Sequence, residues 1–107
     1  MPIPEVNVDE LEAALAAGAR LLDVRETDEY VAGHVGSAVH IALSTVPQQV
    51  DAFRGDGPAY VICKSGGRSL KACEFLAEQG LEVINVAGGT MQWVASGRPV
   101  VTGSAPE

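Results

Sequence analysis

Short apolar segments alternate along the chain with segments of helical periodicity. Four runs of hydrophobic residues, bounded by Gly, Ser, Pro or charged residues, predict buried strands at 21–24, 38–41, 60–63 and 82–86. The runs are mainly apolar and do not alternate regularly with polar residues, which is typical of a parallel sheet covered on both faces. We therefore expect an α/β protein in which helices form right-handed crossovers between parallel strands.

The segments between these runs predict five helices. Their expected bounds are Asp9 to Gly18, Thr27 to Gly33, Val46 to Gly55, about Arg68 or Ser69 to Gly80, and Thr90 to Ser96. Asp9 has Glu12 three residues after it, which is the spacing of a capping box, and Thr27 is a residue type that caps helices. Glycine suits the C-terminal ends of the first four helices, and Pro47 is tolerated early in the third.

Composition and charge narrow the possible partners. A chain of 107 residues is long enough for one domain with its own hydrophobic core. Fourteen acidic against seven basic side chains give a net charge of −7, which disfavours nucleic acids and anionic membrane surfaces as partners. An anionic substrate would therefore have to be attracted by basic groups close to its site.

The sequence favours a cytoplasmic protein with reduced thiols. The first ten residues lack the basic and apolar regions of a secretion signal, and no apolar stretch approaches the roughly 20 residues of a membrane span. The two cysteines, Cys63 and Cys73, do not form a disulfide framework, and no Cys or His cluster offers the four ligands of a zinc site. We expect neither a metal nor a cofactor.

The segment CKSGGRS follows the most apolar predicted strand and contains the main candidate chemistry. Ligands of open α/β sheets bind beyond the carboxyl ends of the strands, and Cys63 is the last residue of this strand. Gly66 and Gly67 allow backbone N–H groups to turn inward, and the next helix directs its positive end to the same place. Together with the cations Lys64 and Arg68, these features favour a nucleophilic thiolate in an anion-binding loop.

This segment and its surroundings resemble the single-domain rhodanese sulfurtransferases. The resemblance rests on LLDVRETDEYVAGHVGSAVHIAL before the loop, on CKSGGRS itself and on VINVAGGTMQWVASGRPV after it. It extends from about residue 6 to residue 101. It implies a rhodanese-like three-layer α/β/α fold with a central five-stranded parallel sheet, in a single domain over 1–107. We expect the remaining tail, 102–107, to be flexible.

The resemblance also implies sulfurtransferase activity. Cys63 would attack the outer sulfur of a small anionic donor such as thiosulfate, form a persulfide and pass the sulfur to cyanide or a thiol. Backbone amides of the loop, with Arg68, would hold the persulfide or the anion. The expected substrate-binding residues are Lys64, Ser65, Gly66, Gly67 and Arg68, of which Lys64 and Ser65 are candidates for donor selectivity. Asp23 and Arg25 are expected beside the loop in a supporting role.

Two other functions are considered. Cysteine-based phosphatases and arsenate reductases need Cys-x5-Arg to encircle a tetrahedral oxyanion, whereas this loop is Cys-x4-Arg and suits a persulfide sulfur better. No Asp is convincingly placed as an acid for the leaving group. A persulfide carrier, or a regulatory module acting with a protein partner, would use the same loop as the enzyme. Loss of activity in such modules usually removes the cysteine, and Cys63 is present.

Other reactive or polar residues are interpreted structurally. Cys73 shares a helical stripe with Leu70 and Leu76, so we assign it to the core, with a resolving thiol as the alternative. His34 and His40 lack neighbouring metal ligands and are not needed as bases by a thiolate mechanism.

Four further interpretations concern the surroundings of the loop. Arg25 forms either an exposed salt bridge or a support for the loop. Trp93, with Met91 and Val94, is expected to pack the last helix against the sheet. A plain strand-to-helix connection is preferred at 88–89 over a second close backbone turn. The acidic residues Glu26, Asp28 and Glu29 are expected to form a solvated helix start.

Overall fold

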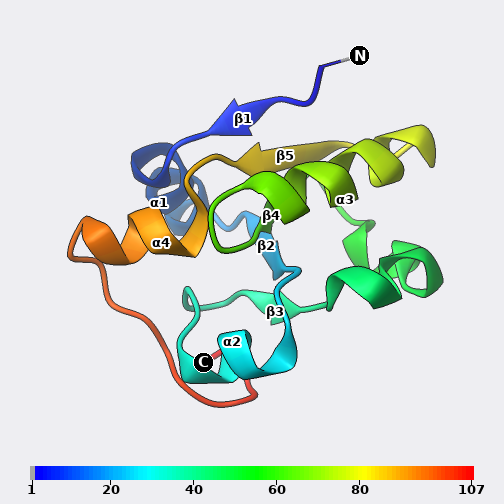
Figure 1. The fold of residues 1–107 in the computed structure, drawn as a ribbon. Coiled ribbons are helices and arrows are strands. Elements are labelled where there is room, and N and C mark those ends of the chain that lie inside the picture. The colour runs from blue at the N-terminus through cyan, green and yellow to red at the C-terminus, as the bar shows by residue number, and fades with distance from the viewer. Residues whose placement is uncertain (1) are drawn as a thin grey trace.

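Five parallel strands form one sheet in the order β1-β5-β4-β2-β3. A computed structural model describes residues 2–107 (Figure 1). The strands are β1 Glu5–Val6, β2 Arg20–Asp23, β3 Val39–His40, β4 Ala59–Ile62 and β5 Val83–Val86. The fold class predicted from the apolar runs is confirmed, and the fifth strand that the resemblance implied is β1.

Helices cover both faces of this sheet (Figure 1). The α-helices are α1 Val8–Ala16, α2 Thr27–Ala32, α3 Gly67–Glu78 and α4 Gly89–Ala95, and two 3-10 helices are η1 Leu43–Gln48 and η2 Val50–Phe53. Because all strands are parallel, each crossover returns the chain to the same edge of the sheet, so the carboxyl ends of the strands lie together.

The core consists of two apolar layers, one on each face of the sheet. On one face, Val61 packs with α3 and the 3-10 helices, and on the other Ile62 packs with α1 and α4; both side chains are fully buried. Successive residues of a strand point to opposite faces, so a strand in the middle of such a sheet is mainly apolar on both faces. This explains why the strands were recognisable as short continuous apolar runs.

The N-terminal cap of the first helix lies two residues earlier than predicted. Its cap is Asn7, whose side chain accepts a hydrogen bond from the Glu10 N–H at 2.8 Å, while Glu10 accepts one from the Asn7 N–H at 3.0 Å. The predicted box of Asp9 and Glu12 is therefore wrong. Val8 is buried, and the earlier start allows the helix to present it to the sheet. In α2, likewise, the cap is Glu26 and not Thr27.

The segment predicted as one helix from Val46 to Gly55 lies within two 3-10 helices and the residues that follow them. Pro47 is the fifth residue of η1 and not an early residue of an α-helix. Proline inside an α-helix removes a hydrogen bond and clashes with the preceding turn, which favours short 3-10 turns here. Val46 and Phe53 of this segment are nevertheless buried in the core.

The C-terminal segment makes backbone hydrogen bonds with α2 and with the segment that follows it. Val101 exchanges two backbone hydrogen bonds with His34, at 2.8 and 2.7 Å. Within the tail itself, the Gly103 N–H donates to the Val31 carbonyl at 2.9 Å, and the Pro106 carbonyl accepts from the Ser37 N–H at 3.2 Å. The tail is thus attached to α2 and to the segment that follows it.

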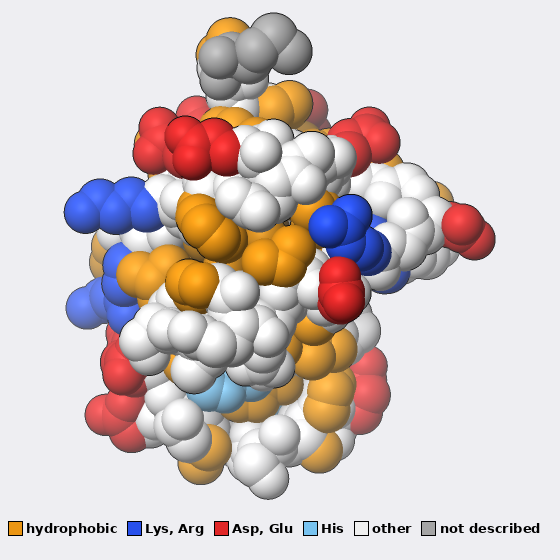
Figure 2. All heavy atoms as spheres, turned by 90° about the vertical axis from the view of Figure 1, so that its right-hand side faces the viewer, with side chains coloured by type: hydrophobic (Ala, Val, Ile, Leu, Met, Phe, Trp, Pro, Cys, Tyr) orange, Lys and Arg blue, Asp and Glu red, His pale blue; other side chains and the backbone are white. Residues whose placement is uncertain are grey.

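The surface carries mixed chemistry. Figure 2 shows one face, on which hydrophobic side chains gather near the centre while Lys, Arg, Asp and Glu side chains lie around them. Within residues 2–107, none of the helices combines the length and apolar character needed to cross a membrane.

Candidate active site

Cys63 lies directly after β4, at the carboxyl edge of the sheet. It is 1% exposed, and the loop that follows it leads into α3, which begins at Gly67. Gly66 caps this helix in the left-handed conformation, with φ of 106°. That conformation is readily available to glycine, and it turns the chain so that the start of α3 faces the sulfur. The predicted location of the loop is confirmed, with the helix starting one residue earlier than expected.

The Cys63 sulfur is surrounded by hydrogen-bond donors. The Gly66 N–H donates to Sγ at 3.1 Å, and the Ser69 hydroxyl lies 3.3 Å from Sγ. Burial raises the pKa of Cys63, but the hydrogen bonds outweigh it and hold the pKa below the usual value of a cysteine. Three of the donors are the backbone N–H groups of Ser65, Gly66 and Ser69, and the Ser69 hydroxyl is a fourth when its proton points to the sulfur. The site therefore favours a thiolate.

A second close backbone turn supports the loop from β5. The Thr90 and Met91 N–H groups donate to the carbonyls of Cys63 and Lys64, both at 2.9 Å. Gly89 has φ of 60°, and a Cβ atom there would lie 2.5 Å from both carbonyl oxygens. The preferred prediction of a plain strand-to-helix connection is therefore wrong, and the alternative, a close turn at the same edge, is correct.

Three polar side chains near the sulfur were not predicted as part of the site. Ser69 Oγ lies 2.5 Å from Asn85 Oδ1, and Asn85 Nδ2 donates to Glu5 at 2.7 Å. Ser69 and Asn85 are buried. Asn85 had a signal in the sequence, because it is the polar residue inside the apolar run of β5 and a buried amide requires partners. Ser69 stood within the quoted motif without a role, and Glu5 had no signal.

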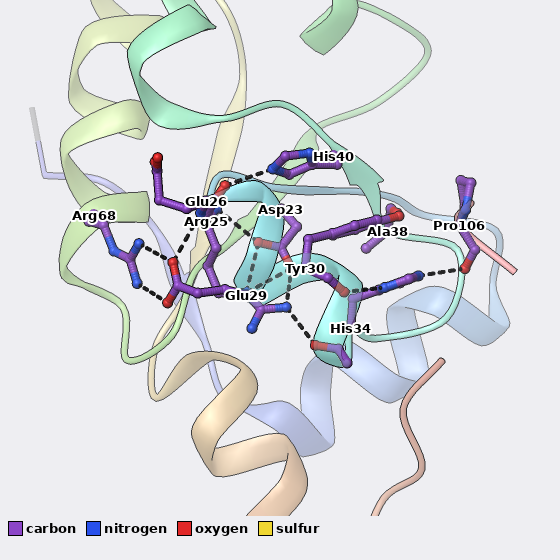
Figure 3. A network of polar contacts seen from close by, with 11 residues as sticks. Asp23, Arg25, Glu26, Glu29, Tyr30, His34, Ala38, His40, Arg68 and Pro106 are labelled. Atoms are coloured by element: carbon purple, nitrogen blue, oxygen red, sulfur yellow. Dashed lines mark hydrogen bonds and ion pairs between the residues drawn. The ribbon is translucent and has the colours of Figure 1, made fainter. Parts of the chain in front are cut away.

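Arg68 is bound by an acidic residue of α2. Its guanidinium forms two hydrogen bonds to the Glu29 carboxylate, at 2.7 and 2.9 Å (Figure 3). The hydrogen bond from Arg68 holds the pKa of Glu29 at about 2. Glu29 is thus not simply part of a solvated helix start, as its sequence position suggested. It ties the end of the loop to α2.

This ion pair predicts a stability difference that depends on pH. The folded-state pKa of Glu29 lies below its ordinary 4.5, so the pair stabilises the protein fully above pH 4.5, and the stabilisation is lost as the pH falls towards 2. Both side chains are partly exposed, so we expect Glu29→Gln to cost at most about 1 kcal/mol at neutral pH. Denaturation of the wild type and of Glu29→Gln is measured at several values between pH 7 and pH 2. The difference in their free energies of unfolding should disappear as the pH falls from 4.5 towards 2. Asp28→Asn, which removes a charge from the same helix turn, is the control; an equal, pH-independent cost in both variants would contradict the account.

Asp23 and Arg25 form a buried ion pair beside the loop. Arg25 binds the Asp23 carboxylate through Nε and Nη2, at 2.9 to 3.1 Å, and Nη2 also donates to the Gly33 carbonyl at 2.8 Å. Asp23 is fully buried and Arg25 is 6% exposed. Arg25 therefore forms no exposed salt bridge. Figure 3 shows the pair next to α2, the helix whose Glu29 binds Arg68.

A cavity of about 470 Å³ opens beside the loop. Arg25, Glu29, Lys64 and Thr90 contribute polar groups to it. Its apolar lining is formed by Ala32, Met91, Val94 and Val100. Met91 and Val94 are each 53% exposed, so the prediction that they pack α4 against the sheet is wrong, although Trp93 is buried as predicted. Of the predicted site residues, the structure brings Lys64 and Arg25 together at this cavity, while Arg68 faces Glu29.

Cys73 and the two histidines lie in structural positions, as interpreted from the sequence. Cys73 is fully buried in the core with Leu76, and burial raises its pKa to about 12. The ring of His34 stacks on Tyr30 and its Nδ1 lies 2.8 Å from the Tyr30 carbonyl, while His40 Nε2 lies 2.7 Å from the Arg25 carbonyl. The Tyr30 hydroxyl in turn donates to the Ala38 carbonyl (Figure 3).

Comparison with known proteins agrees with this architecture. The family model for the rhodanese-like domain matches residues 7–96. A protein of Allochromatium vinosum named sulfurtransferase is 31% identical over 98% of this chain and 98% of its own length. The thiosulfate sulfurtransferase GlpE of Actinobacillus pleuropneumoniae is 35% identical over 79% of this chain and 80% of its own.

The crystal structure of a rhodanese-related protein from Thermoplasma volcanium superposes with a TM-score of 0.85 at 34% identity. The match covers 92% of this chain and 97% of that one. With the parallel sheet, the loop after β4 and the matched family model in agreement, the chain belongs to the rhodanese-like domain family.

Proposed function

We propose that the protein is a sulfurtransferase that carries a sulfane sulfur as a persulfide on Cys63. The thiolate attacks the outer sulfur of a donor such as thiosulfate, a sulfur–sulfur bond forms to Sγ, and the donor's own sulfur–sulfur bond breaks as sulfite leaves with the electron pair. Cyanide or a thiolate then attacks the outer sulfur of the persulfide. Thiocyanate or a new persulfide leaves, and the Cys63 thiolate is regenerated.

The observation that carries this proposal is the set of donors around the Cys63 sulfur. The Gly66 N–H lies 3.1 Å from Sγ, and the first turn of α3 faces the same atom. Such a cradle stabilises negative charge on sulfur in both the thiolate and the persulfide. The cycle also needs a reduced thiol, which is consistent with the proposed cytoplasmic location.

Lys64 is the cation that we assign to attraction of the anionic donor. In the part of the chain that the structure describes, Arg25 is paired with Asp23 and Arg68 with Glu29, whereas Lys64 has no ion pair. Lys64 is exposed and lines the cavity beside the loop. The charges nearest the cavity thus sum to +1 in a protein whose total is −7.

This assignment predicts a selective effect of Lys64→Gln. An exposed charge contributes up to about 1 kcal/mol, so KM for thiosulfate should rise by about three- to fivefold while kcat changes little. The increase should shrink at high salt, because screening weakens the interaction in the wild type. Lys71→Gln removes an exposed lysine of α3 and serves as the control. An equal rise in KM in both variants would show that only total charge matters.

A second candidate function is delivery of sulfur between proteins, with the same persulfide acting as a carrier. The apolar wall beside the loop favours it, because Met91 and Val94 are both about half exposed and thiosulfate itself has no apolar surface to cover them. A cysteine-bearing segment of a partner protein would bury such side chains. This function differs from the first in its acceptor and keeps Cys63 in the same role.

Initial-rate kinetics test the proposed cycle. Thiocyanate formation is measured while thiosulfate and cyanide are varied against each other. A persulfide formed before the acceptor binds requires ping-pong kinetics, seen as parallel lines in double-reciprocal plots. Intersecting lines would indicate direct transfer between two bound substrates and would contradict the persulfide intermediate.

A further inference from the structure

Ser69, Asn85 and Glu5 form a chain of hydrogen bonds that begins at the reactive sulfur and ends at the edge of the sheet. Ser69 Oγ lies 3.3 Å from Cys63 Sγ and 2.5 Å from Asn85 Oδ1, and Asn85 Nδ2 lies 2.7 Å from Glu5 Oε2. Ser69 is fully buried and Asn85 is 1% exposed. The transfer steps described above use none of the three side chains.

The orientation of the Asn85 amide is fixed by its neighbours. Nδ2 faces the Glu5 carboxylate at 2.7 Å and the Gly66 carbonyl at 3.2 Å, and both groups can only accept hydrogen bonds. Turning the amide over would place its oxygen against these two acceptors. Asn85 therefore directs its own oxygen at Ser69.

This orientation determines where the Ser69 hydroxyl proton points. The hydroxyl has one proton and three acceptors within reach, namely Cys63 Sγ and the Gly66 carbonyl, each at 3.3 Å, and Asn85 Oδ1 at 2.5 Å. Asn85 Oδ1 has no proton to give, so this short contact requires Ser69 to be the donor. The proton is then directed away from the sulfur, and a lone pair of Ser69 faces it.

We propose that Asn85, oriented by Glu5, is a positioning residue that holds the Ser69 proton away from the Cys63 sulfur. The inference rests on the proposed role of Cys63 as the nucleophile. Backbone N–H groups still stabilise the thiolate, and the hydroxyl does not add to them while its proton points to Asn85. A thiolate with fewer hydrogen bonds is more basic, and its nucleophilicity rises with basicity. The chain of hydrogen bonds thus preserves the nucleophilicity of the thiolate inside a loop rich in donors.

The other charged and titratable groups near the sulfur belong to different interactions. Substitutions at Ser69, Asn85 or Glu5 do not alter the side chains of these other groups. A shift of the midpoint that requires the Ser69 hydroxyl therefore cannot come from their charges. The groups are Lys64 of the loop, Arg68 and Cys73 of α3, and Asp23 and Arg25 after β2.

The test is the pH dependence of Cys63 alkylation by iodoacetamide, followed by mass spectrometry of the Cys63 peptide. It needs no sulfur donor, so its result is independent of whether the protein transfers sulfur. In Asn85→Leu the Ser69 hydroxyl loses its acceptor and turns to the thiolate. We expect the midpoint of the profile to fall by about half a pH unit, which raises the thiolate fraction below the midpoint about threefold. Because the thiolate is also less nucleophilic, alkylation there should be about twofold faster. The plateau rate at high pH should decrease.

A double-mutant cycle with Ser69→Ala assigns the effect to the hydroxyl. The shift should vanish when Asn85→Leu is made in the Ser69→Ala background. An unchanged or higher midpoint in a folded Asn85→Leu protein, or a shift that persists without the hydroxyl, would overturn the proposal.

Glu5→Ala provides a second, less disruptive variant, because Glu5 is an exposed residue on the edge strand. Removal of the carboxylate frees the Asn85 amide to turn over, and the Ser69 hydroxyl can then donate to the sulfur. The midpoint should again fall, and part of the fall should depend on Ser69. Loss of the carboxylate charge alone would act equally with and without the hydroxyl, and an equal shift in both backgrounds would therefore overturn the proposal.

Discussion

Replacing Cys63 with serine should abolish sulfur transfer and leave the fold intact. The hydroxyl of serine is not ionised near neutral pH and cannot form a persulfide, so thiocyanate formation should fall at least about 10³-fold. Serine is nearly isosteric with cysteine, and its oxygen can accept the Gly66 N–H that now binds Sγ. We therefore expect a change in the free energy of unfolding of at most about 1 kcal/mol.

Cys73→Ala is the matched control for this experiment. Cys73 is fully buried, and its raised pKa, about 12, leaves it as a protonated thiol. The variant should lose about 1 kcal/mol or more of stability from the cavity it creates, and should keep most of its activity. Activity that survives in Cys63→Ser would refute the assignment of the nucleophile. Lost activity in a folded Cys73→Ala protein would promote Cys73 to a resolving thiol.

Replacing Gly89 with alanine should cause the largest loss of stability among the glycine positions at the active-site edge. Gly89 has φ of 60°, and an added Cβ would lie 2.5 Å from the carbonyl oxygens of Cys63 and Lys64. The left-handed conformation alone costs alanine about 1–2 kcal/mol, and relief of the overlap requires the two backbone turns to separate. We expect a total loss of about 3 kcal/mol or more, together with reduced transfer activity.

Gly80→Ala separates conformational strain from overlap. Gly80 also has a positive φ, 85°, but an added Cβ there would meet no atom within 4 Å. This variant should lose only about 1–2 kcal/mol. Urea denaturation gives both values, provided that the m-values agree. Equal losses in the two variants would show that the close approach of the turns at Cys63 contributes nothing to stability.

The strands that coincide with apolar runs, and the helices that end near a glycine, were predictable from the sequence. The strand runs now assigned to β2, β4 and β5 were found because strands inside a covered parallel sheet are mainly apolar on both faces. The two-residue edge strand β1 was not found, because pairing with β5 through Pro4, Val6 and Asn85 requires no apolar run. The Asn7 cap had a signal, an Asn with Glu10 three residues later, but the same spacing at Asp9 and Glu12 competed with it.

The candidate site was predictable where it depends on local sequence and not where it depends on tertiary contacts. The placement of Cys63 and of the glycine turn follows from residues next to one another in the chain. Pairing of Arg68 with Glu29 joins residues 39 positions apart, and the bond from Asn85 to Glu5 joins residues 80 apart. Met91 and Val94 were misassigned because helical spacing does not distinguish an apolar face on the core from one that lines an open cavity.

Intact-protein mass spectrometry tests the central claim most directly. The wild type and Cys63→Ser are incubated with thiosulfate, freed of excess donor, weighed, and weighed again after addition of cyanide. We predict that the wild type gains the mass of one sulfur atom and loses it to cyanide, and that Cys63→Ser gains nothing. A wild-type protein that gains no sulfur, or a variant that gains as much as the wild type, would contradict a thiosulfate-loaded persulfide on Cys63.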